Sequence, residues 1–281
     1  MKIGTCVSLS TMKGLEDKFG QLQKYGFTSC QLISWNPKIW TDENAAVICS
    51  LLDTYGITVS AFWCGWEGPS DWNFYEGQLT LGLVPADYRY ARVKNLCDGA
   101  DFAKKLGVTD VVTHMGFIPE NPYDPNYPGF CRAVRTVAEH LKANGQYLLF
   151  ETGQETPVTM LRCFETVGCD NLAINLDTAN LILYGKANPV DALEVFGKYV
   201  RNLHAKDGCW PVNGHDLGIE TAIGEGRVDF PAVFRKLFDL GYDSWITIER
   251  EIEGEQQIRD ILSAREYLQS IMVDVYGREA R

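Results

Sequence analysis

The sequence predicts that residues 1–281 fold as one α/β domain, a single (β/α)8 or TIM barrel. The length of 281 residues lies near the roughly 250 that are typical of such barrels. Apolar residues make up 46% of the chain, which is enough to bury a sizeable core. Two further observations support the barrel: a glycine joint that recurs along the chain, and polar side chains at the ends of four apolar runs.

The glycine joint consists of a helix-like segment, a glycine and then an apolar run. Glycine suits the position just past a helix because it adopts left-handed backbone angles at little cost. Together with the opening run, the joints predict eight strands, with helices between them. The glycines are Gly26, Gly56, Gly107, Gly145, Gly168, Gly197 and Gly241, and the strands are expected at 2–7, 27–33, 57–63, 108–114, 146–151, 170–177, 198–204 and 242–249.

This alternation of strands and helices decides the architecture. Strands that alternate with helices form a parallel sheet. An open doubly wound sheet is the alternative, but no GxGxxG turn follows the first strand, and eight units favour closure into a barrel.

Two long irregular stretches follow the third and fourth strands, at about residues 64–87 and 116–130. Loops after strands lie at the C-terminal face of a barrel, where barrel enzymes build their sites. We therefore expect lids or substrate walls here, with a packed surface loop or a subunit contact as the alternative. The last residues, 276–281, are expected to form a short disordered tail.

Composition limits the partners and the compartment. The formal net charge of −11 disfavours nucleic acid and anionic membrane surfaces, because like charges repel. The nine cysteines lack CxxC spacing, which favours reduced core residues over a disulfide framework or a zinc knuckle. No run of about 18 apolar residues suggests a membrane span. These observations predict a soluble cytoplasmic protein.

Four of the predicted strands end on a possible metal ligand: Glu151, Asp177, His204 and Glu249. These strands are the fifth to eighth, so the side chains should converge on one side of the barrel mouth. Three crowded carboxylates repel one another, and a divalent cation would neutralise them. Three oxygen donors and one imidazole suit Mn2+, Mg2+ or Co2+ better than a thiolate-seeking metal. The alternative is that each residue is only the first solvated position after its strand.

Five segments, at 150–157, 174–185, 200–208, 223–234 and 246–257, carry a family resemblance: FETGQETP, INLDTANLILYG, VRNLHAKDG, IGEGRVDFPAVF and ITIEREIEGEQQ. Through them, essentially the whole chain resembles the sugar phosphate isomerase/epimerase group of the xylose isomerase-like TIM barrels. That group includes ketose 3-epimerases and keto-inositol enzymes, and it shares its fold with DNA-repair endonucleases of the endonuclease IV type.

The resemblance implies Glu151, Asp177, His204 and Glu249 as ligands of a divalent metal, with Mn2+ as the first choice and Mg2+, Co2+ or Zn2+ as alternatives. It also implies that Glu151 and Glu249 are the acid/base pair of a carbohydrate isomerase or epimerase. In that chemistry the metal holds an enediolate while a carboxylate moves the proton next to a carbonyl. A small sugar or sugar-derived substrate and a homodimer or homotetramer follow by the same resemblance.

Other functions remain open at this point. A lyase or dehydratase acting on a keto-sugar or keto-inositol would begin with the same proton abstraction and then expel a leaving group. A phosphodiesterase would need more histidines and a basic groove, whereas this acidic chain has four histidines. A non-catalytic sugar-binding protein is the remaining class.

Several residues near the predicted strand ends are candidates for substrate contacts. Where epimerases of free ketoses often carry a histidine and an arginine, this chain has Asn180 and Trp210. The glycines of GEG, at 224–226, could bind a phosphate or form a turn, so the phosphorylation state of the substrate stays open. The substrate-binding candidates are His114, Glu155, Asn180, Lys206, Trp63 and Trp66.

Overall fold

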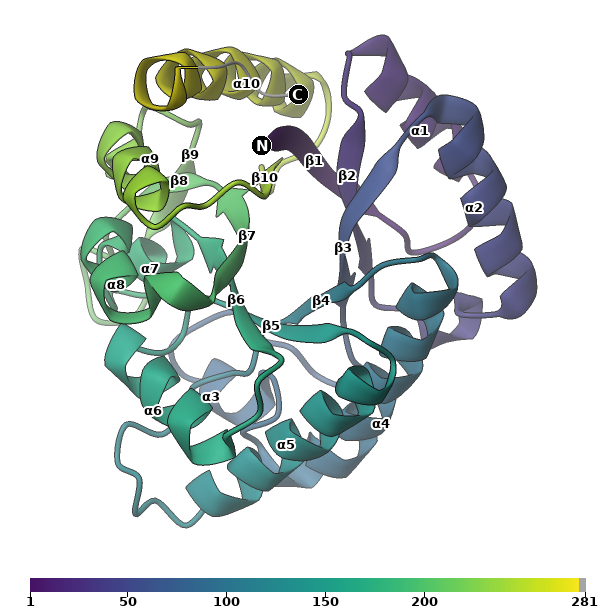
Figure 1. Cartoon of the computed structure of the whole chain (residues 1–281). Coiled ribbons are helices and arrows are strands. Elements are labelled where there is room, and N and C mark those ends of the chain that lie inside the picture. Colours follow the sequence, from purple (N-terminus) through teal and green to yellow (C-terminus); the bar gives the residue numbers. More distant parts are fainter. Residues whose placement is uncertain (278–281) are drawn as a thin grey trace.

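The computed structural model describes residues 1–277 and shows a closed barrel of eight parallel strands, as predicted (Figure 1). Around the barrel the strands follow the order β1-β10-β7-β6-β5-β4-β3-β2. Their bounds are β1 Lys2–Ser8, β2 Ser29–Ser34, β3 Thr58–Cys64, β4 Asp110–Thr113, β5 Tyr147–Glu151, β6 Leu172–Asp177, β7 Val200–Ala205 and β10 Trp245–Ile248.

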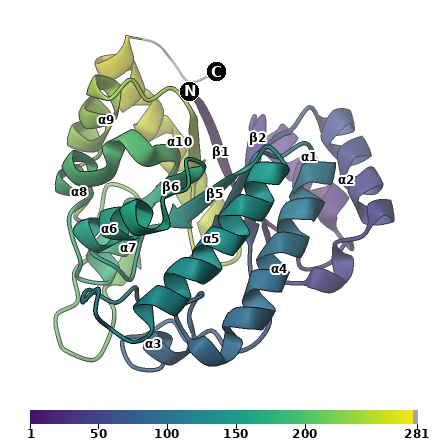
Figure 2. The ribbon, with the colours of Figure 1, turned by 60° about the horizontal axis from the view of Figure 1, so that its bottom comes forward.

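The longer helices form an outer ring around the strands (Figures 1 and 2). They are α1 Leu15–Lys24, α2 Asp42–Tyr55, α4 Ala86–Lys105, α5 Tyr127–Ala143, α6 Pro157–Val167, α8 Pro189–Phe196, α9 Phe230–Asp239 and α10 Glu255–Tyr276. Short elements that the sequence did not reveal lie between them: η1 Pro37–Ile39, α3 Gly77–Thr80, α7 Asn180–Leu183, η2 Gly197–Tyr199, and the antiparallel pair β8 Asp207–Cys209 and β9 Ile219–Thr221.

Six of the seven joint glycines adopt the left-handed conformation that the joint predicts, with φ between 63° and 75°. Gly197 differs, because its φ is −54° and it begins η2. A Cβ atom at Gly197 would lie 2.4 Å from Leu240 Cδ1. Position 197 therefore requires a glycine because a larger side chain would collide with Leu240, and not because of its backbone conformation.

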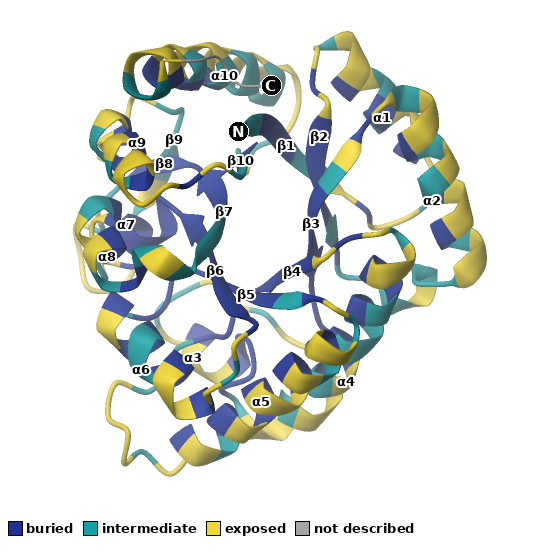
Figure 3. Cartoon of the chain, viewed as in Figure 1, coloured by how far each residue is buried: buried dark blue, intermediate teal, exposed yellow. Residues whose placement is uncertain are grey.

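The strands of the barrel are largely buried (Figure 3), and their apolar side chains belong to two clusters. On β3 to β6, alternate residues such as Ala61, Val112, Leu149 and Ala173 form a small apolar cluster. Intervening residues such as Phe150 join the larger cluster beneath the helices. Because side chains alternate along a strand, the small cluster fills the barrel interior. The residues that end β5 and β6 share this facing, so they point into the barrel mouth.

The two long loops end earlier than expected, because α4 begins at Ala86 and α5 at Tyr127. Pro85 caps α4 and Pro128 lies in the first turn of α5, where a proline fits without loss of a hydrogen bond. Both prolines fall within the stretches predicted to be irregular, but they start the helices.

The two loops cross at a pair of glycines, Gly82 with φ 67° and Gly116 with φ 88°. A Cβ atom at Gly82 would lie 2.1 Å from the Met115 carbonyl oxygen. On α4, the buried Arg92 donates hydrogen bonds of 2.7 Å to the carbonyl oxygens of Gly82 and Pro69. The loop between β3 and α4 is therefore tied down as a fixed wall of the mouth.

Several sequence predictions concern the remainder of the chain. All nine cysteines are free, as expected. No helix within residues 1–277 is long and apolar enough to cross a membrane. Of the predicted disordered tail, Tyr276 ends α10 and Gly277 caps it. Residues 278–281 lie outside the described part of the chain.

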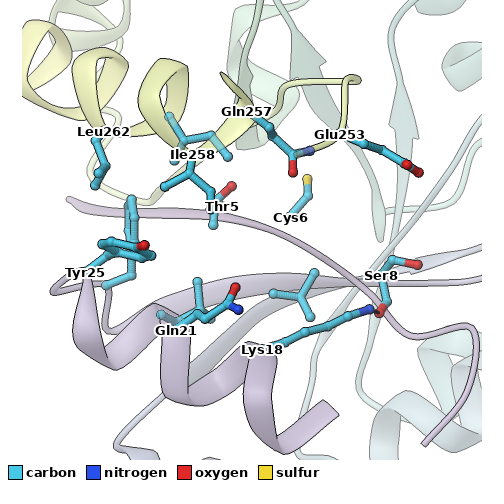
Figure 4. A pocket seen from close by; sticks show the side chains of 14 residues that line it. Thr5, Cys6, Ser8, Lys18, Gln21, Tyr25, Glu253, Gln257, Ile258 and Leu262 are labelled. Atoms are coloured by element: carbon cyan, nitrogen blue, oxygen red, sulfur yellow. Dashed lines mark hydrogen bonds between the residues drawn. The ribbon is translucent and has the colours of Figure 1, made fainter. Parts of the chain in front are cut away.

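A cavity of about 360 Å3 lies between α1, α10 and the edge of β1 (Figure 4). Apolar side chains such as Leu22, Ile258 and Leu262 line it, with Lys18 and Glu253 on its rim. None of the four predicted metal ligands lines this cavity, so the chemistry must be sought at the barrel mouth.

Candidate metal centre and substrate pocket

The structure brings the four predicted metal ligands together. Glu151 ends β5, Asp177 ends β6, His204 lies near the end of β7, and Glu249 follows β10. These four strands are neighbours in the barrel. One potential ligand atom from each side chain lies within 4.8 Å of all the others. The four residues thus form a group that could hold a single metal ion.

His204 is oriented for metal binding by a residue of β2. Its Nε2 donates to Gln31 Oε1 at 2.7 Å, so Nδ1 faces the carboxylates. Burial lowers the pKa of His204, but Glu151 and Glu249 outweigh it and raise this pKa well above its usual value. A bound metal would take the place of the Nδ1 proton. Nδ1 lies 3.3 Å from Glu249 Oε2 and 3.4 Å from Glu151 Oε1. Gln31 was not identified from the sequence, because a single glutamine inside a strand carries no signal.

Two buried polar atoms at the centre of this group make no hydrogen bond within the described residues: His204 Nδ1 and Asp177 Oδ2. Burying polar atoms without partners is costly. The other oxygen of Asp177, Oδ1, accepts from the backbone N–H groups of Ala179 and Asn180 at 2.8 and 2.7 Å. The start of α7 thereby fixes the Asp177 carboxylate. A divalent cation would satisfy both unpaired atoms, so the residues present fit a metal.

Glu151 is held by three side chains. Trp63 Nε1 donates to Oε2, and Asn180 Nδ2 donates to Oε1 at 3.4 Å. His114 Nε2 also lies 3.4 Å from Oε1. Trp63, His114 and Asn180 thus surround one of the two predicted proton-transfer carboxylates.

The charges of the cluster shift its pKa values in opposite directions. Burial alone would raise the pKa of Glu151, but His204 and His114 lower it to about 2. Burial is likewise outweighed at Glu249, where Lys206 and His204 hold the pKa well below its usual value. The pKa of Asp177 is raised well above its usual value by burial and by the neighbouring glutamates. Burial and the neighbouring glutamates thus disfavour the ionised form of Asp177, and a bound divalent cation would favour it.

Lys206 lies beside the metal group with 2% of its side chain exposed. Its Nζ lies 2.7 Å from Glu251 Oε2, 3.2 Å from Glu249 Oε2 and 3.4 Å from Asn180 Oδ1. The structure thus directs the Lys206 amino group toward carboxylates. The predicted contact with substrate would require Lys206 to give up one of these partners.

A pocket of about 340 Å3 opens directly over Glu151 and Glu249. Three predicted substrate residues, Trp63, His114 and Asn180, line it, whereas Trp66, Glu155 and Lys206 are not among its described lining residues. The sequence analysis missed other lining residues, which are Ile33, Trp35, Ser70, Trp72, Leu183, Tyr184, Leu217 and Glu251.

Tryptophans form one wall of this pocket. The ring of Trp35 lies 5.0 Å from those of Trp63 and Trp66. Trp72 packs edge-on against His114 at 5.1 Å and keeps 41% of its surface exposed. Trp66 is buried behind them. Aromatic faces of this kind pack against the apolar side of sugar rings.

Glu155 is buried at 2% exposure, and neither of its carboxylate oxygens makes a hydrogen bond within the described residues. Burial raises its pKa to about 7, against the opposing effect of His114. Glu155 therefore holds a proton at a higher pH than an exposed glutamate does.

The backbone N–H groups of Gly224 and Gly226 in the GEG segment are hydrogen-bonded within the protein. Asp207 Oδ2 accepts from the backbone N–H groups of Gly224 and Gly226 at 2.9 and 3.0 Å. Asp207 Oδ1 accepts from those of Gly208 and Val228 at 2.8 and 3.0 Å. The amides that a substrate phosphate would use are already bonded to a carboxylate, so the turn interpretation of these glycines holds.

Comparisons with known proteins agree with this geometry. The sequence model of a family described as xylose isomerase-like TIM barrel matches residues 19–271. A crystal structure of a xylose isomerase domain protein from Planctomyces limnophilus has a TM-score of 0.92 to this chain. The two sequences are 34% identical, and the match covers 99% of each chain.

Two further relatives differ in activity. Inosose dehydratase of Lacticaseibacillus casei is 26% identical over 170 residues, which span 53% of this chain and 56% of that protein. A structure of an L-ribulose 3-epimerase shares the fold with a TM-score of 0.75 and 20% identity, over 100% of this chain and 98% of the other.

Proposed function

The chain belongs to the xylose isomerase-like TIM barrel family, and from this premise we propose that it is a divalent-metal-dependent isomerase or epimerase of a carbohydrate. The observation that carries the proposal is the group of Glu151, Asp177, His204 and Glu249, whose ligand atoms lie within 4.8 Å of one another. Oxygen donors predominate, which favours Mn2+, with Mg2+, Co2+ or Zn2+ as alternatives.

Proton transfer is assigned to Glu151 and Glu249. Both line the pocket, and β6 and β7 separate their strands, so they reach a bound substrate from different sides. Low pKa values keep both carboxylates ionised at neutral pH, so either can remove a proton from the carbon next to a carbonyl. The other carboxylate, after taking up a proton from solvent, would donate it to the opposite face and invert the centre, whereas return of the abstracted proton to the neighbouring carbon would isomerise the sugar.

The remaining residues bind and orient the substrate. A cation held by the four ligands would act as a Lewis acid that polarises the substrate carbonyl. His114 and Asn180 line the pocket next to Glu151, where they can donate to sugar hydroxyls. Trp35, Trp63 and Trp72 offer apolar faces and exclude water from one side.

A dehydratase is the second candidate, because the match to inosose dehydratase favours it. It would use the same carboxylate to abstract the proton, and the substrate would then lose a hydroxyl group. Mass analysis of the product separates the two, because dehydration removes one water while epimerisation and isomerisation leave the mass unchanged.

The pocket favours a substrate without phosphate. Its described lining residues include three carboxylates, Glu151, Glu249 and Glu251, and no lysine or arginine. Phosphate recognition normally relies on such cations or on free backbone amides. Lys206 is engaged by carboxylates, and the GEG amides are bonded to Asp207.

We therefore expect neutral ketoses and keto-inositols, but not their phosphate esters, to exchange a proton with solvent. The purified Mn2+-loaded protein would be incubated in D2O with matched pairs of each sugar and its phosphate ester. Deuterium incorporation would be followed by NMR, and product mass by mass spectrometry. Preferential exchange of the phosphate esters would contradict the neutral-substrate assignment, and no exchange in any ketose or keto-inositol would count against the proposed function.

A further inference from the structure

Lys206 and Glu251 form a charged link between Glu249 and the outer part of the barrel. Lys206 Nζ lies between the two carboxylates, 3.2 Å from Glu249 Oε2 and 2.7 Å from Glu251 Oε2. The backbone N–H of Glu251 donates to both oxygens of Glu220 on β9, at 3.1 Å. Glu220 in turn pairs with Arg250 at 3.0 Å.

This link ends on a helix. Arg250 Nε donates to Asp260 of α10 at 2.8 Å. A series of contacts, which passes through the backbone N–H and then the side chain of Glu251, thus runs from α10 and the β8–β9 pair to the Glu249 carboxylate.

Glu249 depends on this link more than the other carboxylates do on their neighbours. Asp177 accepts two backbone N–H bonds, and Glu151 accepts bonds from Trp63 and Asn180. Glu249 comes after the last residue of β10, and within residues 1–277 its Oε1 accepts only from the weak donor Cys6 Sγ, at 3.9 Å. Its Oε2 also lies 3.3 Å from His204 Nδ1. Lys206 therefore makes the strongest donor contact to the Glu249 side chain.

We propose that Lys206 and Glu251 are positioning residues that hold Glu249 in place for metal binding and proton transfer. This inference rests on the proposed function of the same site. Glu251 acts through Lys206, and Lys206 acts through its bond to Glu249 Oε2. Residues that orient metal ligands in this way typically contribute about 10- to 100-fold to metal affinity.

Electrostatic repulsion alone predicts that Lys206→Met strengthens metal binding, which is the opposite of what the positioning role predicts. Lys206 adds a positive charge beside the cation, so its removal should strengthen metal binding if electrostatic repulsion were its main effect. If Lys206 positions Glu249, its removal should weaken metal binding despite the relief of repulsion. The sign of the change in Lys206→Met therefore separates the two explanations.

The test titrates the metal-free full-length protein with Mn2+ by isothermal titration calorimetry. Glu251→Gln and Lys206→Met are each expected to raise the Kd for Mn2+ by about 10- to 100-fold. Glu253→Gln is the matched control, because it removes the same charge from the same loop at a residue that lines the outer cavity, and it should stay within about twofold of wild type. Wild-type affinity in Glu251→Gln, or equal or tighter binding in Lys206→Met, would overturn the proposal.

A second measurement guards against a variant that does not fold. The Glu251 side chain is 61% exposed, so Glu251→Gln can carry the test alone if Lys206→Met unfolds. The visible spectrum of the Co2+ form, which reports on ligand geometry, should change in Glu251→Gln and not in Glu253→Gln. If wild type binds no Mn2+, the proposed function fails as well; if wild type binds it and both variants match wild type, only the positioning role fails.

Discussion

Replacing Glu249 with glutamine is expected to slow proton exchange between a neutral substrate and solvent by about 10²- to 10⁴-fold, the range that general acid–base catalysis contributes. Glutamine keeps the shape of the side chain and one oxygen for the metal, but it cannot accept a proton. The rate would be measured in D2O, at Mn2+ concentrations that saturate the variant, so that weaker metal binding does not contribute.

Glu151→Gln should slow product formation by a similar factor, because the second carboxylate returns the proton. Glu253→Gln, which lies in the loop after β10 and lines the outer cavity, should retain the wild-type rate. A Glu249→Gln protein that keeps more than a tenth of the wild-type exchange rate at saturating Mn2+ would show that another residue moves the proton.

The largest expected effect on stability comes from Asp207→Ala. This substitution removes the acceptor of four backbone N–H groups, those of Gly208, Gly224, Gly226 and Val228. Bonds to a charged acceptor contribute about 1.5–3 kcal/mol each, and water can reach part of the segment once the carboxylate is gone. We expect a loss of about 3–5 kcal/mol in the free energy of unfolding, measured by urea denaturation.

Asp216→Ala is the matched control for this prediction. Asp216 lies in the loop between β8, which begins with Asp207, and β9, and its side chain accepts a single exposed bond from Asn213 Nδ2 at 3.1 Å. Its removal should change the free energy of unfolding by less than about 0.5 kcal/mol. Equal stability of Asp207→Ala and Asp216→Ala would mean that the GEG segment does not depend on the buried carboxylate.

The sequence was sufficient for the barrel because local signals repeat. Left-handed glycines such as Gly56 and Gly168 mark helix ends, and six of the eight barrel strands follow such a glycine. The left-handed conformation predicted for Gly197 was wrong. At this position, close packing against Leu240 requires a glycine, and the backbone conformation does not. The β8–β9 pair was missed because strands of three residues carry no periodic signal.

The metal group could be predicted because its members end strands, where position along the chain translates directly into position in the barrel. Trp35 follows the end of β2 and could have been found by the same rule. Trp72 and Leu217 reach the pocket from irregular segments, and the segment of Trp72 is held by contacts such as those of Arg92 with Pro69 and Gly82. No local pattern in the sequence encodes such contacts.

The central claim is that Glu151, Asp177, His204 and Glu249 hold one divalent cation. The most direct test is the metal content of the purified protein, measured by elemental mass spectrometry, with His204→Ala as the control. The proposed site predicts about one Mn2+, or Mg2+, Co2+ or Zn2+ in its place, per wild-type chain and its loss in the variant. A wild-type protein that holds no metal even after reconstitution, or a His204→Ala protein with the same metal content as wild type, would contradict it.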